Sequence, residues 1–172
     1  MYKKLFLLLI IMVVLAKLGY AGQIDTAIAL AKVQVATVFA ISLDRTDIDF
    51  GEMRPGEVKY DIPATGIKVT TKTNTGNKWY LLINTLTELR AGDRYIDNKY
   101  FGWYGWTEGQ GKWFGTGDNS ITLNPFTVYE SSVDEGLNLP NGTNNIFKFK
   151  LDLPKDQPAG RYEASVRFTL TE

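Results

Sequence analysis

Apolar and polar side chains alternate near the end of the chain, a pattern typical of β-strands with one buried face. Residues 147–153 place phenylalanine and leucine on one face and charged side chains on the other. Residues 161–171 alternate in the same way, and the apolar face consists of Tyr162, Ala164, Val166, Phe168 and Leu170. Because only residues 154–160, with two prolines, separate the two runs, we predict that they form an antiparallel pair.

The same pattern predicts further strands upstream. Residues 66–73 alternate isoleucine, valine and threonine with lysine and threonine, and the turn residues 74–77 follow them. In residues 78–85 both faces are apolar, with tryptophan, leucine and isoleucine on one and tyrosine and leucine on the other. We therefore expect residues 78–85 to form a central strand or one that is covered on both sides.

These runs predict the fold class. Residues 33–43 are a long β-prone run, residues 127–129 fit a short strand, and only residues 23–32 have helical spacing. The chain thus holds about seven to nine strands, with turn signals roughly every 8–12 residues, which indicates an all-β antiparallel sandwich. Residues 98–139 are the least regular segment, and we interpret them as a long insertion between strands.

The N-terminus has the features of a secretory signal. Lys3 and Lys4 precede 12 consecutive apolar residues, a run too short to span a bilayer, and Gly19 and Ala21 fit a cleavage site. We predict a signal peptide at 1–21 and a single domain at 22–172, with no transmembrane anchor after cleavage. The protein is then expected in the periplasm, at the cell surface or outside the cell.

Two residue types are missing from the whole sequence, cysteine and histidine. Without cysteine, the domain depends on its core and has no disulfide bonds, which favours a bacterial envelope protein. Without histidine, the Ser-His-Asp triad and histidine-based zinc chemistry are impossible. We expect no enzyme activity and no cofactor.

The charge balance excludes some partners. Removing the three lysines of the predicted signal leaves 16 basic and 19 acidic residues, a net charge of −3. Nothing in this balance points to nucleic acid or to an anionic membrane. The expected partner is an envelope protein or a polysaccharide.

Residues 100–114 carry three of the four tryptophans, separated by glycines. One interpretation is a platform on which sugar rings stack; the candidate ligand-binding residues are Tyr100, Trp103, Tyr104, Trp106 and Trp113. Nearby side chains could bind sugar hydroxyls: Asp97, Asn98, Glu108, Gln110 and Asp118. The alternative is that the rings pack in the core. Trp103 and Trp106 are three residues apart, so they point to opposite faces of a strand unless Gly105 forms a bulge.

Carboxylates offer no specific site. Asp44, Asp47, Asp49 and Glu52 lie close in sequence, but their spacing does not match an EF-hand loop, so we predict no metal site. Glu108 and Asp118 could flank a glycosidase cleft, but nothing singles them out.

Residues 33–43 follow the predicted signal after a short leader, and they support one more alternative. In exported subunits that polymerise, a free N-terminal strand completes the sheet of a neighbouring subunit. The simpler interpretation, which we favour, is that this run is the first strand of its own sandwich.

Some turn motifs resemble known families. Residues 48–57 (Ile-Asp-Phe-Gly-Glu-Met-Arg-Pro-Gly-Glu) and 73–77 (Thr-Asn-Thr-Gly-Asn) resemble immunoglobulin-like modules of the ASPM/SPD-2/Hydin and major-sperm-protein type. Residues 158–162 (Pro-Ala-Gly-Arg-Tyr) and 168–171 resemble bacterial exported sandwiches of the spore-coat-U/fimbrial-like and WxL types. The resemblance covers about a third of the chain and implies an immunoglobulin-like β-sandwich that binds or assembles.

The sequence therefore predicts an exported, non-enzymatic structural or adhesion-type module of the bacterial envelope. A carbohydrate-binding module that uses residues 103–113 and a pilus-like subunit that assembles through residues 33–43 are the alternatives.

Overall fold

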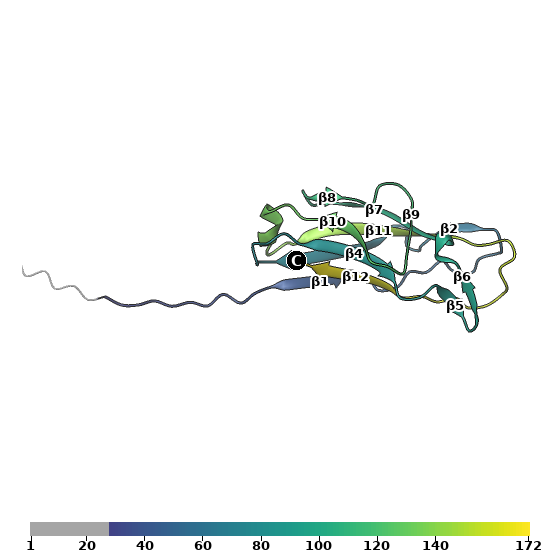
Figure 1. Cartoon of the computed structure of the whole chain (residues 1–172), viewed down its shortest axis with the longest axis horizontal. Helices are drawn as coiled ribbons and strands as arrows, with labels where there is room; N and C mark the ends of the chain where they lie inside the picture. The colour runs from purple at the N-terminus through teal and green to yellow at the C-terminus, as the bar shows by residue number, and fades with distance from the viewer. Residues whose placement is uncertain (1–27) are drawn as a thin grey trace, which may run out of the picture. The chain divides into compact units, whose positions relative to one another are not determined.

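The computed structural model describes residues 28–172, and the predicted signal peptide lies outside them. The chain forms an all-β protein in which two antiparallel sheets, of six and four strands, pack as a sandwich. Ala36–Glu172 make one compact unit, and residues 28–35 belong to a separate one in which no helix or strand is described (Figure 1). The predicted helical spacing of residues 23–32 therefore gives no helix over residues 28–32.

The six-stranded sheet has the order β1-β3-β11-β7-β9, and β2 pairs with β11 beyond the end of β3. Its strands are β1 (Phe39–Leu43), β2 (Val58–Tyr60), β3 (Ile67–Thr73), β7 (Phe101–Thr107), β9 (Asn119–Ser120) and β11 (Thr143–Asp152). The ten-residue β11 is its centre, because it pairs with β3 and β2 along one side and with β7 along the other.

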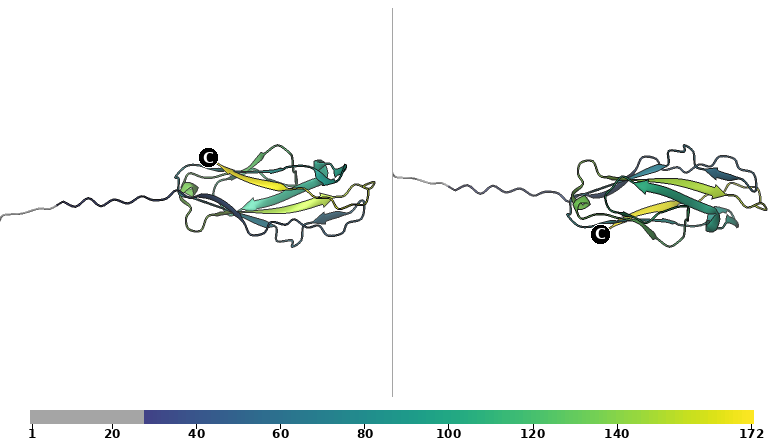
Figure 2. Two further views of the ribbon diagram at one scale, coloured as in Figure 1. Left: turned by 90° about the horizontal axis from the view of Figure 1, so that it is seen from below. Right: turned by 90° about the horizontal axis from the view of Figure 1, so that it is seen from above.

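The four-stranded sheet has the order β12-β4-β10-β8, and Figure 2 shows the two sheets as facing layers. Its strands are β4 (Tyr80–Thr85), β8 (Lys112–Trp113), β10 (Phe126–Glu130) and β12 (Val166–Thr171). A separate hairpin consists of β5 (Leu89–Ala91) and β6 (Arg94–Ile96), and two 3-10 helices are η1 (Asn98–Tyr100) and η2 (Asp134–Leu137).

The strand predictions for residues 66–73, 78–85 and 127–129 are confirmed as β3, β4 and β10. β4 is central, between β12 and β10, and its side chains Leu81 and Ile83 are buried in the core beside Trp79. The alternation of apolar residues identified these faces correctly because a strand turns successive side chains to opposite sides.

The predicted antiparallel pair near the C-terminus is wrong. β11 lies in the six-stranded sheet, whereas β12 lies in the four-stranded sheet and pairs with β4. The connecting residues 153–165 thus pass from one sheet to the other instead of forming a hairpin. β12 begins only at Val166, although Glu163 forms an isolated bridge with Arg90.

The predicted insertion at residues 98–139 is also wrong, and the described residues form 12 strands instead of seven to nine. This segment supplies β7 to β10, and β7 lies inside the six-stranded sheet. Its glycines allow close strand pairing rather than interrupting the strand: a Cβ on Gly105 would lie 2.0 Å from the Ile146 carbonyl oxygen.

A buried ion pair fixes the segment between β1 and β3. The Asp61 carboxylate is 2% exposed, contacts the Arg45 guanidinium, and accepts a hydrogen bond from the Phe149 N–H at 2.9 Å. Arg45 also donates to the Gly66 carbonyl at 3.2 Å. Removing either charge would leave the other buried without its ion-pair partner. The pair therefore anchors the segment between β1 and β3 to β11.

Candidate functional site

β7 sends the predicted aromatic candidates to two different faces of its sheet. Phe101 and Trp103 are buried in the core, each only 2% exposed, whereas Tyr104 is half-buried and Trp106 is 45% exposed on the outer face. The five candidates therefore do not form one surface.

Trp103 and Trp113 belong to a closed side of the sandwich, where β7 and β9 of one sheet face β10 and β8 of the other. The Trp103 ring meets that of Trp113 edge-on at 6.2 Å and that of Phe147 at 5.5 Å. The indole N–H of Trp113 donates to the Gly115 carbonyl at 2.8 Å, and a Cβ on Gly115 would lie 2.5 Å from Trp103. These two rings thus fill the space between the sheets, as the core interpretation predicted.

Tyr100 ends η1 and is half-buried against the core, with the Lys99 ammonium 4.9 Å from its ring centre. Tyr100 lies six residues before Trp106, at the other end of β7.

Tyr104 and Trp106 share the outer face of the six-stranded sheet with two residues that the sequence analysis did not single out. The ring of Tyr60, on β2, meets Tyr104 edge-on at 5.8 Å. The Lys148 ammonium, on β11, lies 6.0 Å from the Tyr104 ring and 5.6 Å from the Trp106 ring. We call Tyr60, Tyr104, Trp106 and Lys148 the aromatic platform.

Four of the five polar side chains predicted beside the aromatic segment make a hydrogen bond or an ion pair, although the Asn98 side-chain oxygen is buried without a partner among the described residues. Glu108 accepts a hydrogen bond from the Asn144 amide at 2.8 Å, and Asp118 pairs with Lys150 at 3.2 Å. Asp97 caps η1 through the Lys99 N–H, and the Asn98 amide donates to Thr85 at 3.2 Å. The Gln110 backbone N–H donates to Glu135 at 3.2 Å.

On the side opposite Trp103 and Trp113, the sandwich is open. β1 and β12 are the edge strands of the two sheets there, they contact each other, and each pairs with a single neighbour (Figure 1). Three side chains of β1 pair in register with the buried residues Val69, Thr71 and Thr73 of β3. The three β1 side chains nevertheless remain 36–39% exposed: Phe39, Ile41 and Leu43. The facing β12 side chains are only half-buried: Val166, Phe168 and Leu170.

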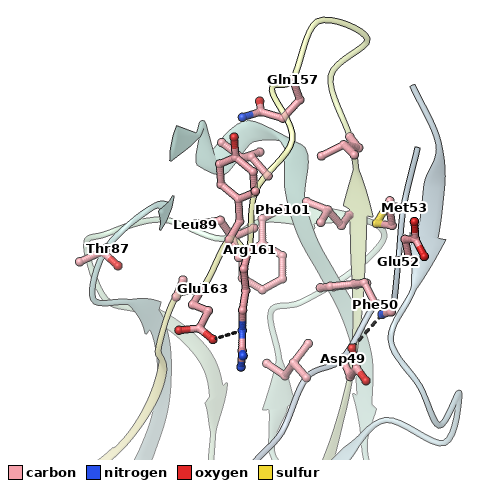
Figure 3. A pocket seen from close by; sticks show the side chains of 18 of the residues that line it. Asp49, Phe50, Glu52, Met53, Thr87, Leu89, Phe101, Gln157, Arg161 and Glu163 are labelled. Carbon is pink, nitrogen blue, oxygen red and sulfur yellow. Dashed lines mark hydrogen bonds and ion pairs between the residues drawn. The ribbon is translucent and has the colours of Figure 1, made fainter. Parts of the chain in front are cut away.

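A cavity of about 1110 Å3 lies beside this edge, between the segment that follows β1 and the one that precedes β12. Residues 46–55 line one side of it and residues 157–166 line the other. Figure 3 shows Asp49, Glu52 and Met53 on one side, Thr87 and Glu163 on the other, and Phe101 and Leu89 between them. We call this cavity, together with the adjacent edge strands β1 and β12, the open groove; of these two strands only Val166 lines the cavity itself.

The residues upstream of β1 carry exposed apolar side chains. In residues 28–35, which we call the leader, the most exposed are Ile28 at 97%, Leu30 at 79%, Val33 at 90% and Val35 at 76%. The predicted run 33–43 is thus divided: residues 39–43 are β1 of the molecule's own sheet, as the simpler interpretation held, and residues 33–35 are not in it.

A buried carboxylate holds the loop that connects the two sheets on the closed side. Glu135 is 8% exposed, accepts from the Tyr129 hydroxyl at 2.6 and 2.7 Å, and accepts from the Ser132 N–H at 2.8 Å. Burial alone would raise the pKa of Glu135, but hydrogen bonds from Tyr129, Ser132, Gln110 and Thr143 outweigh it and hold the pKa below its ordinary value. Burial, and then the bond to Glu135, raise the pKa of Tyr129 well above its ordinary range. Both oxygens of the Glu135 carboxylate accept hydrogen bonds from within the protein. We therefore interpret the pair of Glu135 and Tyr129 as structural.

Two of the carboxylates considered for calcium accept hydrogen bonds from backbone N–H groups. Asp44 accepts from the Lys68 N–H and Asp49 from the Gly51 N–H, each at 2.8 Å. Over residues 28–172, histidine, cysteine and carboxylate side chains form no group of three placed to hold a metal ion. In the same part of the chain, no helix has the length and apolarity needed to cross a membrane.

No model of a known protein family matches this chain, and no curated protein sequence is significantly similar to it.

Proposed function

We propose that this protein is a non-enzymatic, exported structural subunit that assembles with copies of itself, the leader of one copy lying in the open groove of the next. The observation that carries this proposal is the pair of unpaired edges, β1 and β12, which expose core-facing apolar side chains on the same side of the sandwich. A strand added there would bury these side chains and pair with free backbone groups at the same time.

The leader suits the open groove in length and pattern. Eight extended residues reach about 26 Å, while the six residues of β12 span about 20 Å. Ala29, Ala31, Val33 and Val35 occupy one face of an extended leader, and the other face holds Ile28, Leu30, Lys32 and Gln34. Small and β-branched side chains are those that fit between two sheets already in contact.

The donor is proposed to be a second copy because of how β1 begins. The Val38 N–H donates to the Asn74 side chain at 2.7 Å, and the Asn74 N–H donates to the Val38 carbonyl at 3.1 Å. The Asn74 amide also donates to the Ala36 carbonyl at 2.9 Å. Residues 36–38 are thus held in line with β1 by Asn74.

The finer description of the fold, an immunoglobulin-like sandwich of the exported bacterial type, is part of this proposal. It is supported by the connections, since β3 to β4, β7 to β8 and β11 to β12 each pass from one sheet to the other. Export is supported by the signal pattern of residues 1–21.

The test is the oligomeric state of residues 22–172, measured by size-exclusion chromatography and by gel electrophoresis in SDS without heating. We expect a ladder of multimers that collapses to monomer on heating. Replacing Val33 and Val35 together by aspartate puts charge on the face that enters the groove, and we expect a folded monomer.

The matched control places the same two charges on the opposite face, by Lys32→Asp with Gln34→Asp, and should keep the ladder. Ile41→Asp tests the groove itself and should also give monomer, with an unchanged circular dichroism spectrum. A wild-type protein that stays monomeric at high concentration, or a control that loses the ladder equally, would overturn the proposal.

A further inference from the structure

We infer that the aromatic platform on the outer face of the six-stranded sheet is a second binding site, which takes an acidic polysaccharide through its sugar rings and carboxylates. The site does not depend on the proposed assembly, because the platform faces away from the core and from the open groove. It uses β2, β7 and β11, whereas the groove uses β1 and β12.

Pairing of β2 and β7 with β11 fixes the positions of the platform's side chains. Tyr104 pairs in register with Lys148, and Tyr60 with Lys150, so the rings of Tyr60 and Tyr104 meet over β11. Trp106 lies two residues further along β7, about 7 Å away. Two or three pyranose rings in a chain match such a spacing, and their axial C–H groups suit aromatic faces.

Exposure separates this platform from the other aromatics of β7. Tyr60 is 48% exposed and Trp106 is 45% exposed, while Trp103 on the opposite face is 2% exposed. Val58, two residues before Tyr60 on β2, is 49% exposed and extends the apolar area. Exposed aromatic rings gathered on one sheet face are typical of a binding surface.

The charge of the platform selects an acidic ligand. Within the described residues, Lys148 has no carboxylate within ion-pairing distance, although Lys150 beside it pairs with Asp118 at 3.2 Å. Lys68, in register with Ile146 on the neighbouring strand, likewise has no ion-pair partner there. An ammonium that lies against two rings and faces solvent favours a sugar that brings its own carboxylate.

The test is isothermal titration of residues 22–172 carrying Val33→Asp and Val35→Asp, which removes assembly as a complication. The probes are trigalacturonate and trimannuronate, and the matched neutral probes are their methyl esters. We expect binding of at least one acidic trisaccharide, and binding of its ester that is about tenfold weaker, which corresponds to about 1.4 kcal/mol.

Trp106→Ala and Lys148→Gln should each weaken binding of the acidic trisaccharide at least tenfold. Tyr95→Ala and Lys112→Gln are the controls: Tyr95 is 55% exposed on β6, and Lys112 lies 4.7 Å from the Phe114 ring, and neither belongs to the platform. Both controls should bind as the parent does.

Three results would overturn the inference. The first is no binding of either acidic trisaccharide, and the second is equal binding of acid and ester. The third is equal binding of poly-glutamate, which would mark the platform as a site for acidic protein instead of sugar. None of these results bears on the assembly ladder, so the two proposals fail separately.

Discussion

The two long sides of the sandwich differ in how far their apolar side chains are buried. On one side, the Trp103 ring is 2% exposed and packs against the rings of Trp113 and Phe147, with ring centres 6.2 and 5.5 Å away. On the other, Phe39 and Ile41 on β1 remain 39% and 36% exposed although they point toward the core. The same fold thus buries its large rings on one side and leaves apolar side chains partly exposed on the other, where we propose that the leader of a second copy binds.

The largest expected effect is on the closed side. Trp103→Ala should lower the free energy of unfolding by about 3–5 kcal/mol, because the cavity left by the indole cannot collapse between two paired sheets. Denaturant unfolding followed by circular dichroism measures the loss. Trp106→Ala, three residues away on the outer face, is the control and should cost less than about 1 kcal/mol; equal losses would contradict the division between the two faces of β7.

A smaller effect, dependent on pH, is expected at the carboxylate that clamps the closed side. Glu135→Gln should cost about 1–3 kcal/mol at neutral pH, because the charged acceptor of several hydrogen bonds is lost. The folded pKa of Glu135 lies below its ordinary value of 4.5, so its contribution is present above pH 4.5 and is lost as pH falls through the folded pKa. The difference between wild type and variant should therefore shrink in acid.

Unfolding free energies measured at a series of pH values check this sign. Asp134→Asn, at the exposed neighbouring residue, is the control and should show no such convergence with the wild type. A difference that grows as pH falls would mean that Glu135 is protonated in the folded protein.

The smallest effect on stability is expected on the open side. Ile41→Ala should change the free energy of unfolding of the monomer by less than about 1 kcal/mol, since the side chain is partly exposed at an unpaired edge. Denaturant unfolding of the monomeric Val33→Asp, Val35→Asp background, with and without Ile41→Ala, measures it. A loss as large as that of Trp103→Ala would show that the open side is as much a part of the core as the closed one.

Local pattern predicted which residues form strands and which faces they bury. The alternation in residues 66–73, 78–85 and 147–153 is correct because side-chain period and burial are set within a strand. Pairing partners were missed because alternation carries no information on which strand lies next. For this reason residues 147–153 and 161–171 looked like a hairpin although they lie in different sheets.

The glycines of β7 were misleading for a physical reason. The Ile146 carbonyl lies so close to Gly105 that no side chain would fit there. Glycine usually interrupts a strand, but here the pairing of β7 with β11 requires it. Tyr104 and Trp106 were among the candidates, but Tyr60 lies 44 residues before Tyr104 and joins it only through the pairing of β2 and β7 with β11. The open groove likewise depends on which strands end up at the edges.

The central position of β11 has a consequence for the order in which the chain folds. Its partners β2, β3 and β7 are not joined into one sheet until residues 143–152 have been made. Pairing between segments so distant in sequence is slow, and it cannot begin on a partly synthesised chain. A ribosome-bound chain therefore stays without its larger sheet until β11 has been synthesised.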